Sequence, residues 1–419
     1  MRETVRPEGK DRFHWEKIGL RFKAAAAVLM CLISACRGLV SSANSANIIV
    51  FPLSGDRSAG QYAWIGEGVA FSLARQLAGP GVAVIDGDER TALVESIDLP
   101  PRAPLSQGSM IRVAQKASAD LAIMGSYSGT EQNFRITVRV LDVKGLRMGG
   151  DMAANGPLSA LPQLENELAW MILTNMGLRA ASSREIFQQR TRKIPNAAFA
   201  YFVQSWDASN DVDQLNLLLK AVGLHPDFPQ AQFQIGRLYY HGGDYARAIP
   251  HLALAGGQPG TAMECNFMLG NCYLQKDQVQ QAIQAYAPVL QVSRRYEVLN
   301  NLGVANLRRG DLEQALSLFL EAGSLARTDA TVSLNLAIAR HAQGNDNLAL
   351  AGLEAAVKSH PQNGMLHFVL SCLLKAQGQT DRAADSLGRA RRLGINVDKL
   401  QLDDSKSWLR PLLTWASTG

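Results

Sequence analysis

The sequence predicts a chain of two parts with different fold classes, a small α/β domain with a mixed sheet followed by an all-α helical array. In residues 45–178, short apolar runs alternate with amphipathic segments, which is typical of strands and helices in one layered domain. In residues 195–395, one pattern of small and apolar residues returns every 33 or 34 positions, which indicates stacked structural repeats. The chain has 419 residues, of which 47% are hydrophobic, so both parts can bury a core.

Residues 1–44 precede both folds and are predicted to be a leader and linker. A basic segment comes first, and the apolar run AAAAVLMCLISAC follows over residues 24–36. This run is shorter than the roughly 20 residues of a membrane-spanning helix, and it fits the apolar region of a signal peptide. The small residues behind it allow cleavage after Ala43 or Ala46.

A second interpretation of the leader involves Cys36. The residues ISAC at 33–36 resemble the bacterial lipoprotein signal. This resemblance implies that Cys36 is acylated after cleavage and attaches the protein to a membrane. The alternatives are a short uncleaved anchor and a cytosolic apolar helix.

Charge and apolar content exclude two classes of protein. The formal net charge is +5, and residues 1–36 contribute +3 of it through seven basic and four acidic residues. The rest of the chain is therefore nearly neutral, whereas a nucleic-acid binder usually carries a basic face or stripe. No apolar run approaches the length of a membrane-spanning helix, which excludes a multi-pass membrane protein. We expect no nucleic acid among the partners.

The α/β domain is predicted from four apolar runs and four helical segments. Strands are expected at 47–53, 82–86, 120–129 and 133–145, and helices at 64–79, 89–97, 110–117 and 162–177. In the last strand, Phe134, Ile136 and Val138 alternate with polar residues, which predicts a sheet with one solvated face. Gly66 and Gly68 at the start of the first helix predict that this helix packs closely on the sheet.

Several of these segments resemble the TolB amino-terminal-like domain, which is related to the FlgO and CsgG families. The segments are NIIVFPLSG (47–55), WIGEGVAFSLARQL (64–77), ADLAIMGSYSG (119–129), FRITVRVLDVKG (134–145) and LPQLENELAWMI (161–172). The resemblance implies an envelope binding or assembly module without catalytic residues.

The sequence contains no recognisable catalytic, metal or cofactor motif. Gly66-Glu67-Gly68 lacks the lysine of a phosphate-binding loop, and no histidine lies between Asn47 and Ile194. After the leader, the cysteines are Cys265, Cys272 and Cys372, without zinc-ligand spacing. We therefore expect no enzyme activity, no cofactor and no metal, and we interpret these cysteines as small buried helix residues.

The repeats are defined by small residues at fixed positions. Equivalent positions are Phe202, Gly236, Gly270, Gly303, Ala337 and Ser371, at spacings of 34, 34, 33, 34 and 34. An alanine follows each of the last five after twelve residues, at 248, 282, 315, 349 and 383. Small residues at two fixed points let paired helices approach closely, and a glycine in the turn between them can adopt positive φ.

This pattern resembles the tetratricopeptide repeat, including Leu269-Gly270 with Tyr273. The resemblance implies a right-handed solenoid of about six repeats over residues 195–395. A polar connection is expected at 179–194, and a C-terminal capping helix is expected within 396–419, where Leu400–Trp415 carries several large apolar residues.

In tetratricopeptide arrays, the first helix of each pair lines a concave groove, and the resemblance assigns candidate partner-binding residues to it. They are Phe199, Trp206, Phe233, Arg237, Tyr240, Phe267, Asn271, Leu274, Arg308 and Phe368. Such a groove would be apolar and aromatic. The alternative is that these rings only pack between repeats.

The sequence therefore predicts a non-catalytic, envelope-associated scaffold that binds a protein or peptide partner through the repeat groove. We expect it to be exported and to reside in the periplasm or at the outer membrane, attached there if Cys36 carries lipid. The alternative is a cytosolic regulatory scaffold, or one anchored at the inner membrane, that retains its N-terminal apolar segment.

The leader predicts a measurable lipid modification. Metabolic labelling with a radioactive fatty acid should label the full-length protein, and Cys36→Ala should abolish the label because it removes the acceptor thiol. A fusion of residues 1–50 to a reporter active only outside the cytoplasm should be active. An inactive fusion would contradict export, and label that persists in Cys36→Ala would contradict lipidation.

Overall fold

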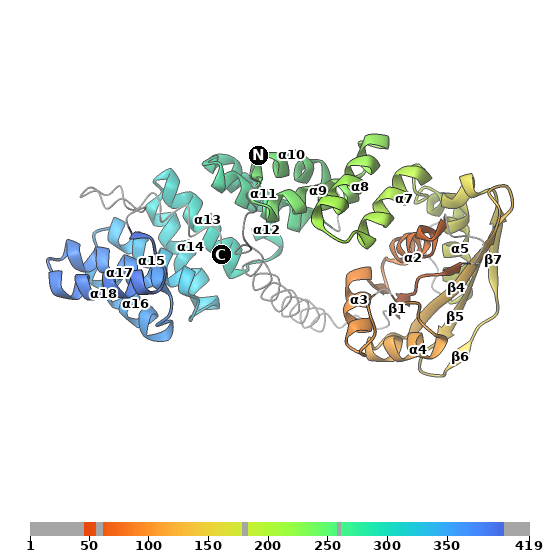
Figure 1. The fold of residues 1–419 in the computed structure, drawn as a ribbon, viewed down its shortest axis with the longest axis horizontal. Helices are drawn as coiled ribbons and strands as arrows, with labels where there is room; N and C mark the ends of the chain where they lie inside the picture. Colours follow the sequence, from red (N-terminus) through yellow and green to blue (C-terminus); the bar gives the residue numbers. More distant parts are fainter. Residues whose placement is uncertain (1–45, 56–61, 102, 178–182, 258–260, 398–419) are drawn as a thin grey trace, which may run out of the picture. The chain divides into compact units, whose positions relative to one another are not determined.

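The computed structural model describes residues 46–55, 62–101, 103–177, 183–257 and 261–397, which form two compact units, Met1–Val203 and Gln204–Gly419 (Figure 1). The leader with Cys36 and the predicted capping helix within 396–419 lie outside the described residues, except for 396 and 397. Within the described parts, none of the helices has the length and apolar character needed to cross a membrane.

The first unit contains a mixed sheet with the strand order β3-β1-β4-β5-β6. The strands are β1 (Ala46–Val50), β2 (Ser54–Gly55), β3 (Val82–Ile85), β4 (Leu121–Gly129), β5 (Phe134–Asp142), β6 (Arg147–Met148) and β7 (Met152–Gly156). Strand β1 pairs in parallel with β3 and β4, β2 pairs in parallel with β4, and β5 pairs antiparallel with β4, β6 and β7. The predicted α/β class is confirmed.

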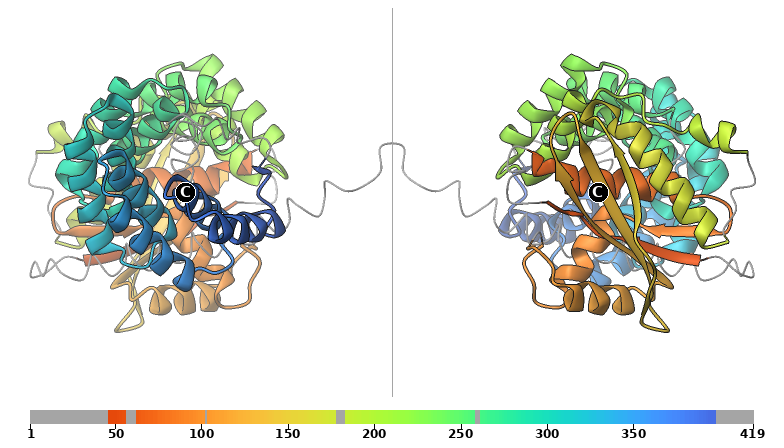
Figure 2. Two further views of the ribbon diagram at one scale, coloured as in Figure 1. Left: turned by 90° about the vertical axis from the view of Figure 1, so that its left-hand side faces the viewer. Right: turned by 90° about the vertical axis from the view of Figure 1, so that its right-hand side faces the viewer.

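Helices cover both faces of this sheet, as Figure 1 and the right-hand view of Figure 2 show. Helices α2 (Trp64–Leu77) and α5 (Leu161–Asn175) pack on the face that carries Ile48 and Val50. Helices α3 (Gly87–Glu95) and α4 (Gln107–Lys116) pack on the face that carries Ile49 and Phe51. Successive side chains of a strand point to opposite faces, so β1 contributes to both cores.

Two local predictions about this unit are confirmed. In β5, Phe134, Ile136 and Val138 are buried while Arg135 and Arg139 are exposed, so the alternation is confirmed for this strand. The expected solvated face is limited to this part of the sheet, because α3 and α4 cover the same face at β1. At the start of α2, a Cβ on Gly66 would lie 2.2 Å from the carbonyl oxygen of Leu53, so only glycine allows this helix to approach the sheet so closely.

The structure differs from the prediction at residues 179–194, which were expected to be a polar connection. Helix α6 (Arg184–Gln188) lies there, and Phe187 is fully buried in the α2–α5 core. The buried amide of Asn166 donates hydrogen bonds to Gln76 Oε1 and to the carbonyl oxygen of Phe187, both at 3.1 Å. One apolar side chain in a polar segment was thus enough to attach it to the core.

Helix α7 (Asn196–Gln204) also differs from the prediction, which placed it in the first repeat. Its Phe199 packs on the α/β unit, with ring centroids 6.1 Å from Trp64 and 6.2 Å from Phe71. The boundary between the units therefore lies at residues 203–204, after the predicted start of the array at 195.

The second unit is an array of antiparallel helix pairs, and the left-hand view of Figure 2 shows successive pairs rotated with respect to one another. A short 3-10 helix, η3 (Ser205–Asp207), precedes them. The helices are α8 (Asp211–Leu224), α9 (Pro229–His241), α10 (Tyr245–Ala255), α11 (Ala262–Gln275), α12 (Val279–Val292), α13 (Tyr296–Arg309), α14 (Leu312–Leu325), α15 (Ala330–Ala342), α16 (Asp346–Ser359), α17 (Gly364–Ala376) and α18 (Thr380–Arg392). The predicted helical solenoid is confirmed.

The turns between paired helices use left-handed backbone, as the sequence predicts. Gly243, Gly310, Gly344 and Gly378 have φ between 73° and 90°. In the α11–α12 pair, Asp277 takes this conformation with φ of 57°, although it has a side chain. Aspartate is one of the few residues that tolerate positive φ.

The predicted close approach of paired helices is also confirmed. A Cβ on Gly236 would lie 2.7 Å from Leu252, one on Gly270 would lie 2.4 Å from the ring of Tyr286, and one on Gly303 would lie 2.6 Å from the ring of Phe319. Each glycine thus makes room for a large side chain of the partner helix.

Alanine substitution of two glycines tests this packing. Gly270→Ala should destabilise the array by about 1–3 kcal/mol, because the added methyl meets a fully buried ring. Gly223→Ala, in exposed α8 with nothing within 4 Å of the added atom, should stabilise it by about 0.5–1 kcal/mol. Urea unfolding followed by circular dichroism measures both effects, and equal effects at the two sites would contradict the packing.

Candidate functional site

The first helices of successive pairs, α9, α11, α13, α15 and α17, lie next to one another along the array. Hydrogen bonds between side chains connect four of them. Asn271 Nδ2 donates to Tyr240 Oη, and Asn301 Nδ2 donates to Asn271 Oδ1, both at 2.8 Å. Asn300 Nδ2 donates to Asn301 Oδ1 at 3.1 Å, and Asn335 Nδ2 donates to Asn300 Oδ1 at 2.8 Å. We call Asn271, Asn300, Asn301 and Asn335 the asparagine ladder.

The asparagine ladder is buried rather than exposed to a partner. Each of its side chains is 5% exposed or less. The hydroxyl of Tyr286 also donates to Asn271 Oδ1, and burial raises the pKa of Tyr286 well above its usual value. Buried amides are tolerated only where they find partners, so the ladder fixes how neighbouring first helices align. Asn335 Oδ1 is the exception, because it has no hydrogen-bond partner within the described chain.

Half of the sequence-predicted groove residues are buried in cores. They are Phe199, Phe233, Asn271, Leu274 and Phe368, and Phe199 belongs to the α/β unit. This part of the prediction is corrected, because a buried side chain offers no surface to a partner. The physical reason for the four residues of the array is that adjacent helices approach so closely that these side chains fill the space between them. Phe199 packs instead against Trp64 and Phe71. For these residues the packing alternative holds.

Other predicted groove residues keep partly exposed side chains. These are Trp206, Arg237, Tyr240 and Phe267. Arg237 lies 5.9 Å from the ring centroid of Phe233. The exposed Arg295, which sequence reasoning missed because it precedes its helix, lies 5.6 Å from the ring centroid of Phe267.

Arg308 differs from the other arginines. Its side chain is only 7% exposed, and Nη1 donates to the carbonyl oxygen of Leu274 and lies 3.9 Å from Asp277 Oδ1. Burial lowers the pKa of Arg308. These contacts hold the end of α11 against α13, so Arg308 stabilises the array instead of facing a partner.

The three cysteines of the described array are free and buried. Burial raises the pKa of Cys265 to about 11 and the pKa values of Cys272 and Cys372 to about 12, so all three are protonated thiols at neutral pH. Among the described residues, no three His, Cys, Asp or Glu side chains lie close enough to hold a metal ion.

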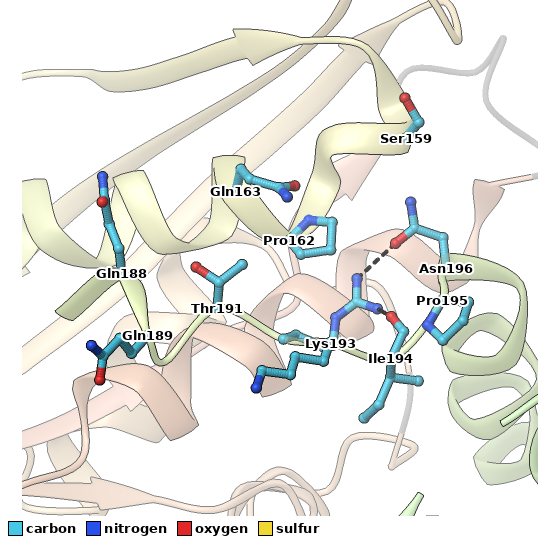
Figure 3. Close-up of a pocket in the computed structure, with 11 residues that line it drawn as sticks. Ser159, Pro162, Gln163, Gln188, Gln189, Thr191, Lys193, Ile194, Pro195 and Asn196 are labelled. Atoms are coloured by element: carbon cyan, nitrogen blue, oxygen red, sulfur yellow. Dashed lines mark hydrogen bonds between the residues drawn. The ribbon is translucent and has the colours of Figure 1, made fainter. Parts of the chain in front are cut away.

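The first unit contains a polar pocket of about 710 Å³, which we call the α5–α7 pocket (Figure 3). It lies between the start of α5, the segment after α6 and the start of α7. Its lining residues are Ser159, Pro162, Gln163, Gln188, Gln189, Thr191, Arg192, Lys193, Ile194, Pro195 and Asn196. Sequence reasoning missed this pocket, because its residues belong to no motif and only tertiary contacts bring them together.

Arg192 organises the α5–α7 pocket. Nη1 donates to the carbonyl oxygen of Ile194 at 2.6 Å, and Nη2 donates to Asn196 Oδ1 at 2.9 Å (Figure 3). Nε lies 3.4 Å from Glu165 Oε2, and the guanidinium carbon lies 4.0 Å from the ring centroid of Phe199. Four kinds of contact therefore hold this guanidinium in place.

Glu165 is the buried partner of Arg192. Its side chain is fully buried on α5, and Oε1 has no hydrogen-bond partner within the described residues. Burial raises the pKa of Glu165, and the positive charge of Arg192 opposes this shift. Burial also lowers the pKa of Arg192. A buried pair of this kind is expensive to break, because the remaining charge stays without a partner.

This pair predicts a pH-dependent defect. Arg192→Gln should destabilise the α/β unit by about 3–5 kcal/mol at neutral pH, because Glu165 remains buried and unpaired. A raised pKa in the folded state means that the stability linked to Glu165 is fully present below its ordinary pKa of 4.5 and is lost as pH rises through the raised pKa. The defect should therefore shrink as pH falls.

Hydrogen exchange of β4 and β5 measures this stability in the intact protein. The double variant Glu165→Gln with Arg192→Gln should recover much of the loss, since it leaves no buried charge. A defect that is independent of pH, or a double variant as unstable as Arg192→Gln, would contradict a coupled ion pair.

Comparison with known proteins identifies part of the array. The sequence model of the tetratricopeptide repeat family matches residues 215–260 and 267–330. No curated protein matches the chain. Among solved structures, PilF of Pseudomonas aeruginosa is 18% identical, with 51% of this chain and 96% of that chain covered and a TM-score of 0.39.

Two further structures resemble the chain to a similar extent. MamA of Desulfovibrio magneticus RS-1 is 16% identical, with 41% and 98% covered and a TM-score of 0.38. YrrB, described as a tetratricopeptide protein with an unusual peptide-binding site, is 15% identical, with 46% and 96% covered and a TM-score of 0.34. The identification therefore rests on the family match and on the helix geometry: residues 215–260 and 267–330 are tetratricopeptide repeats.

Proposed function

We propose that this protein is a non-catalytic scaffold that binds a protein partner through the first-helix face of its repeats. The observation that carries the proposal is a set of exposed or partly exposed side chains on two consecutive first helices and directly before a third. Arg237 and Tyr240 lie on α9, Phe267 lies on α11, and Arg295 immediately precedes α13. We call these four residues the arginine–aromatic patch.

The chemistry of the arginine–aromatic patch suits a protein partner. Tyrosine and arginine are enriched among the residues that dominate binding energy at protein interfaces. The asparagine ladder aligns the helices that carry the patch, so these side chains are presented on a preorganised surface. Two arginines over apolar rings favour a partner segment that combines apolar and acidic side chains.

We extend this proposal to the location of the protein. The apolar leader supports export, and the resemblance of the first unit to the TolB amino-terminal-like domain supports a place in the cell envelope. Acylation of Cys36 would attach the protein to a membrane there. A cytosolic scaffold with a retained apolar segment is the alternative, which the reporter fusion to residues 1–50 distinguishes.

Partner capture tests the proposed surface. Chemical crosslinking of the native protein, followed by mass spectrometry, identifies the partner. The double variant Arg237→Ala with Arg295→Ala should then bind the purified partner about tenfold more weakly or worse, because it removes both charged side chains of the patch. Its circular dichroism spectrum should not change, because Arg295 is exposed and Arg237 is partly exposed.

Arg294→Ala is the matched control for this experiment. Arg294 is adjacent to Arg295 in the chain but forms an exposed ion pair with Glu321 at 2.6 Å. The Arg294→Ala variant should bind the partner with wild-type affinity. If the double variant keeps full affinity, or if the double variant and the control lose the same amount of affinity, the partner binds elsewhere. Replacing Phe233 is a poorer test, because truncation of this buried ring costs about 3–5 kcal/mol of stability.

A further inference from the structure

We infer that the α5–α7 pocket is a second binding site, specific for a peptide segment that carries one carboxylate. This site lies within the α/β unit and does not depend on the repeat surface proposed above. Its volume of about 710 Å³ is in the range of sites that hold small ligands, roughly 300–1,000 Å³.

The charges of the side chains that line the pocket favour a ligand with a single negative charge. The pocket lining contains two basic side chains, Arg192 and Lys193, and no acidic one. The charge of Arg192 is already balanced by Glu165. Lys193 is exposed and makes no ion pair with another described residue. The lining thus carries one uncompensated positive charge. A carboxylate neutralises this charge, whereas a phosphate dianion would leave one negative charge without a partner.

Arg192 offers further donors to such a carboxylate. A guanidinium has five N–H groups, and the contacts with Glu165, Ile194 and Asn196 use three of them. The side chain is 8% exposed and belongs to the pocket lining. Because these contacts hold the guanidinium in place before a ligand arrives, binding does not have to order it.

The neutral side chains of the pocket suit the backbone of a peptide. Gln163 comes from α5, and Gln188 and Gln189 come from the end of α6 and the residue after it (Figure 3). The side-chain amides of these glutamines have no hydrogen-bond partner among the described residues. A glutamine amide both donates and accepts, which matches the N–H and C=O of a peptide group. The hydroxyls of Ser159 and Thr191 add two more polar groups.

A random heptapeptide display library, selected on the full-length protein, tests this inference. Selected peptides should be enriched in Asp or Glu at one position. Replacing that residue by its amide in a synthetic copy should weaken binding about tenfold, because a hydrogen-bonded charge pair becomes a neutral contact. Lys193→Gln should reduce the preference for the acidic copy over the amide copy, because only the donors of Arg192 then remain for the carboxylate, whereas Lys358→Gln, an exposed lysine of the other unit, should behave like the wild type.

Two additional arms identify the ligand. The variant Gln163→Ala with Gln188→Ala should weaken both peptide copies, and free butyrate, which carries one carboxylate, should compete poorly because it lacks peptide groups. Butyrate that binds as tightly as the peptide would overturn the peptide part of the inference. Absence of selected peptides, or acidic selectivity that is undiminished in Lys193→Gln, would overturn the site. The variant of Arg237 and Arg295 should bind these peptides normally, which separates this site from the repeat surface.

Discussion

Close contact between paired helices is the constraint on which the repeat array depends. Gly236, Gly270 and Gly303 leave no room for a side chain, and Leu252, Tyr286 and Phe319 fill the space opposite them. Once paired helices are this close, the first helices of successive pairs also meet, and their large side chains become packing residues. That is why Phe233, Leu274 and Phe368 are buried, although their positions in the repeat predicted a groove.

The same constraint explains the asparagine ladder. Side chains between closely packed first helices must be apolar or must find partners among themselves. Asn271 satisfies this requirement with Tyr240, Tyr286 and Asn301 at once. Apolar contacts permit helices to slide, whereas hydrogen bonds of defined length fix their relative position. The surface side chains above the ladder are therefore held in one arrangement.

The sequence predicts the periodic features of this protein well and the non-periodic features poorly. Strands β1, β3, β4 and β5, the solenoid and the left-handed turn glycines follow from apolar runs or alternation, a fixed spacing and backbone sterics, each of which acts locally. The sequence did not predict β2, β6 and β7. The attachment of α6 and α7 to the α/β unit depends on Phe187 and Phe199. Both rings pack against residues that are distant in the sequence. Nothing in the neighbouring residues reveals that contact, and the α5–α7 pocket follows from the same tertiary contacts.

Repetition itself limits where specificity can reside. Residues that recur in every repeat, such as the small residues at the helix crossings, present the same contact many times and cannot distinguish one partner from another. Arg237, Asn271 and Arg295 have no equivalent of their own kind in the adjacent repeats. The α/β unit shows the same division, because its sheet is regular whereas Glu165 introduces a buried carboxyl group beside the apolar core. Regular residues build both folds, and the residues that depart from the pattern carry the chemistry that a ligand can recognise.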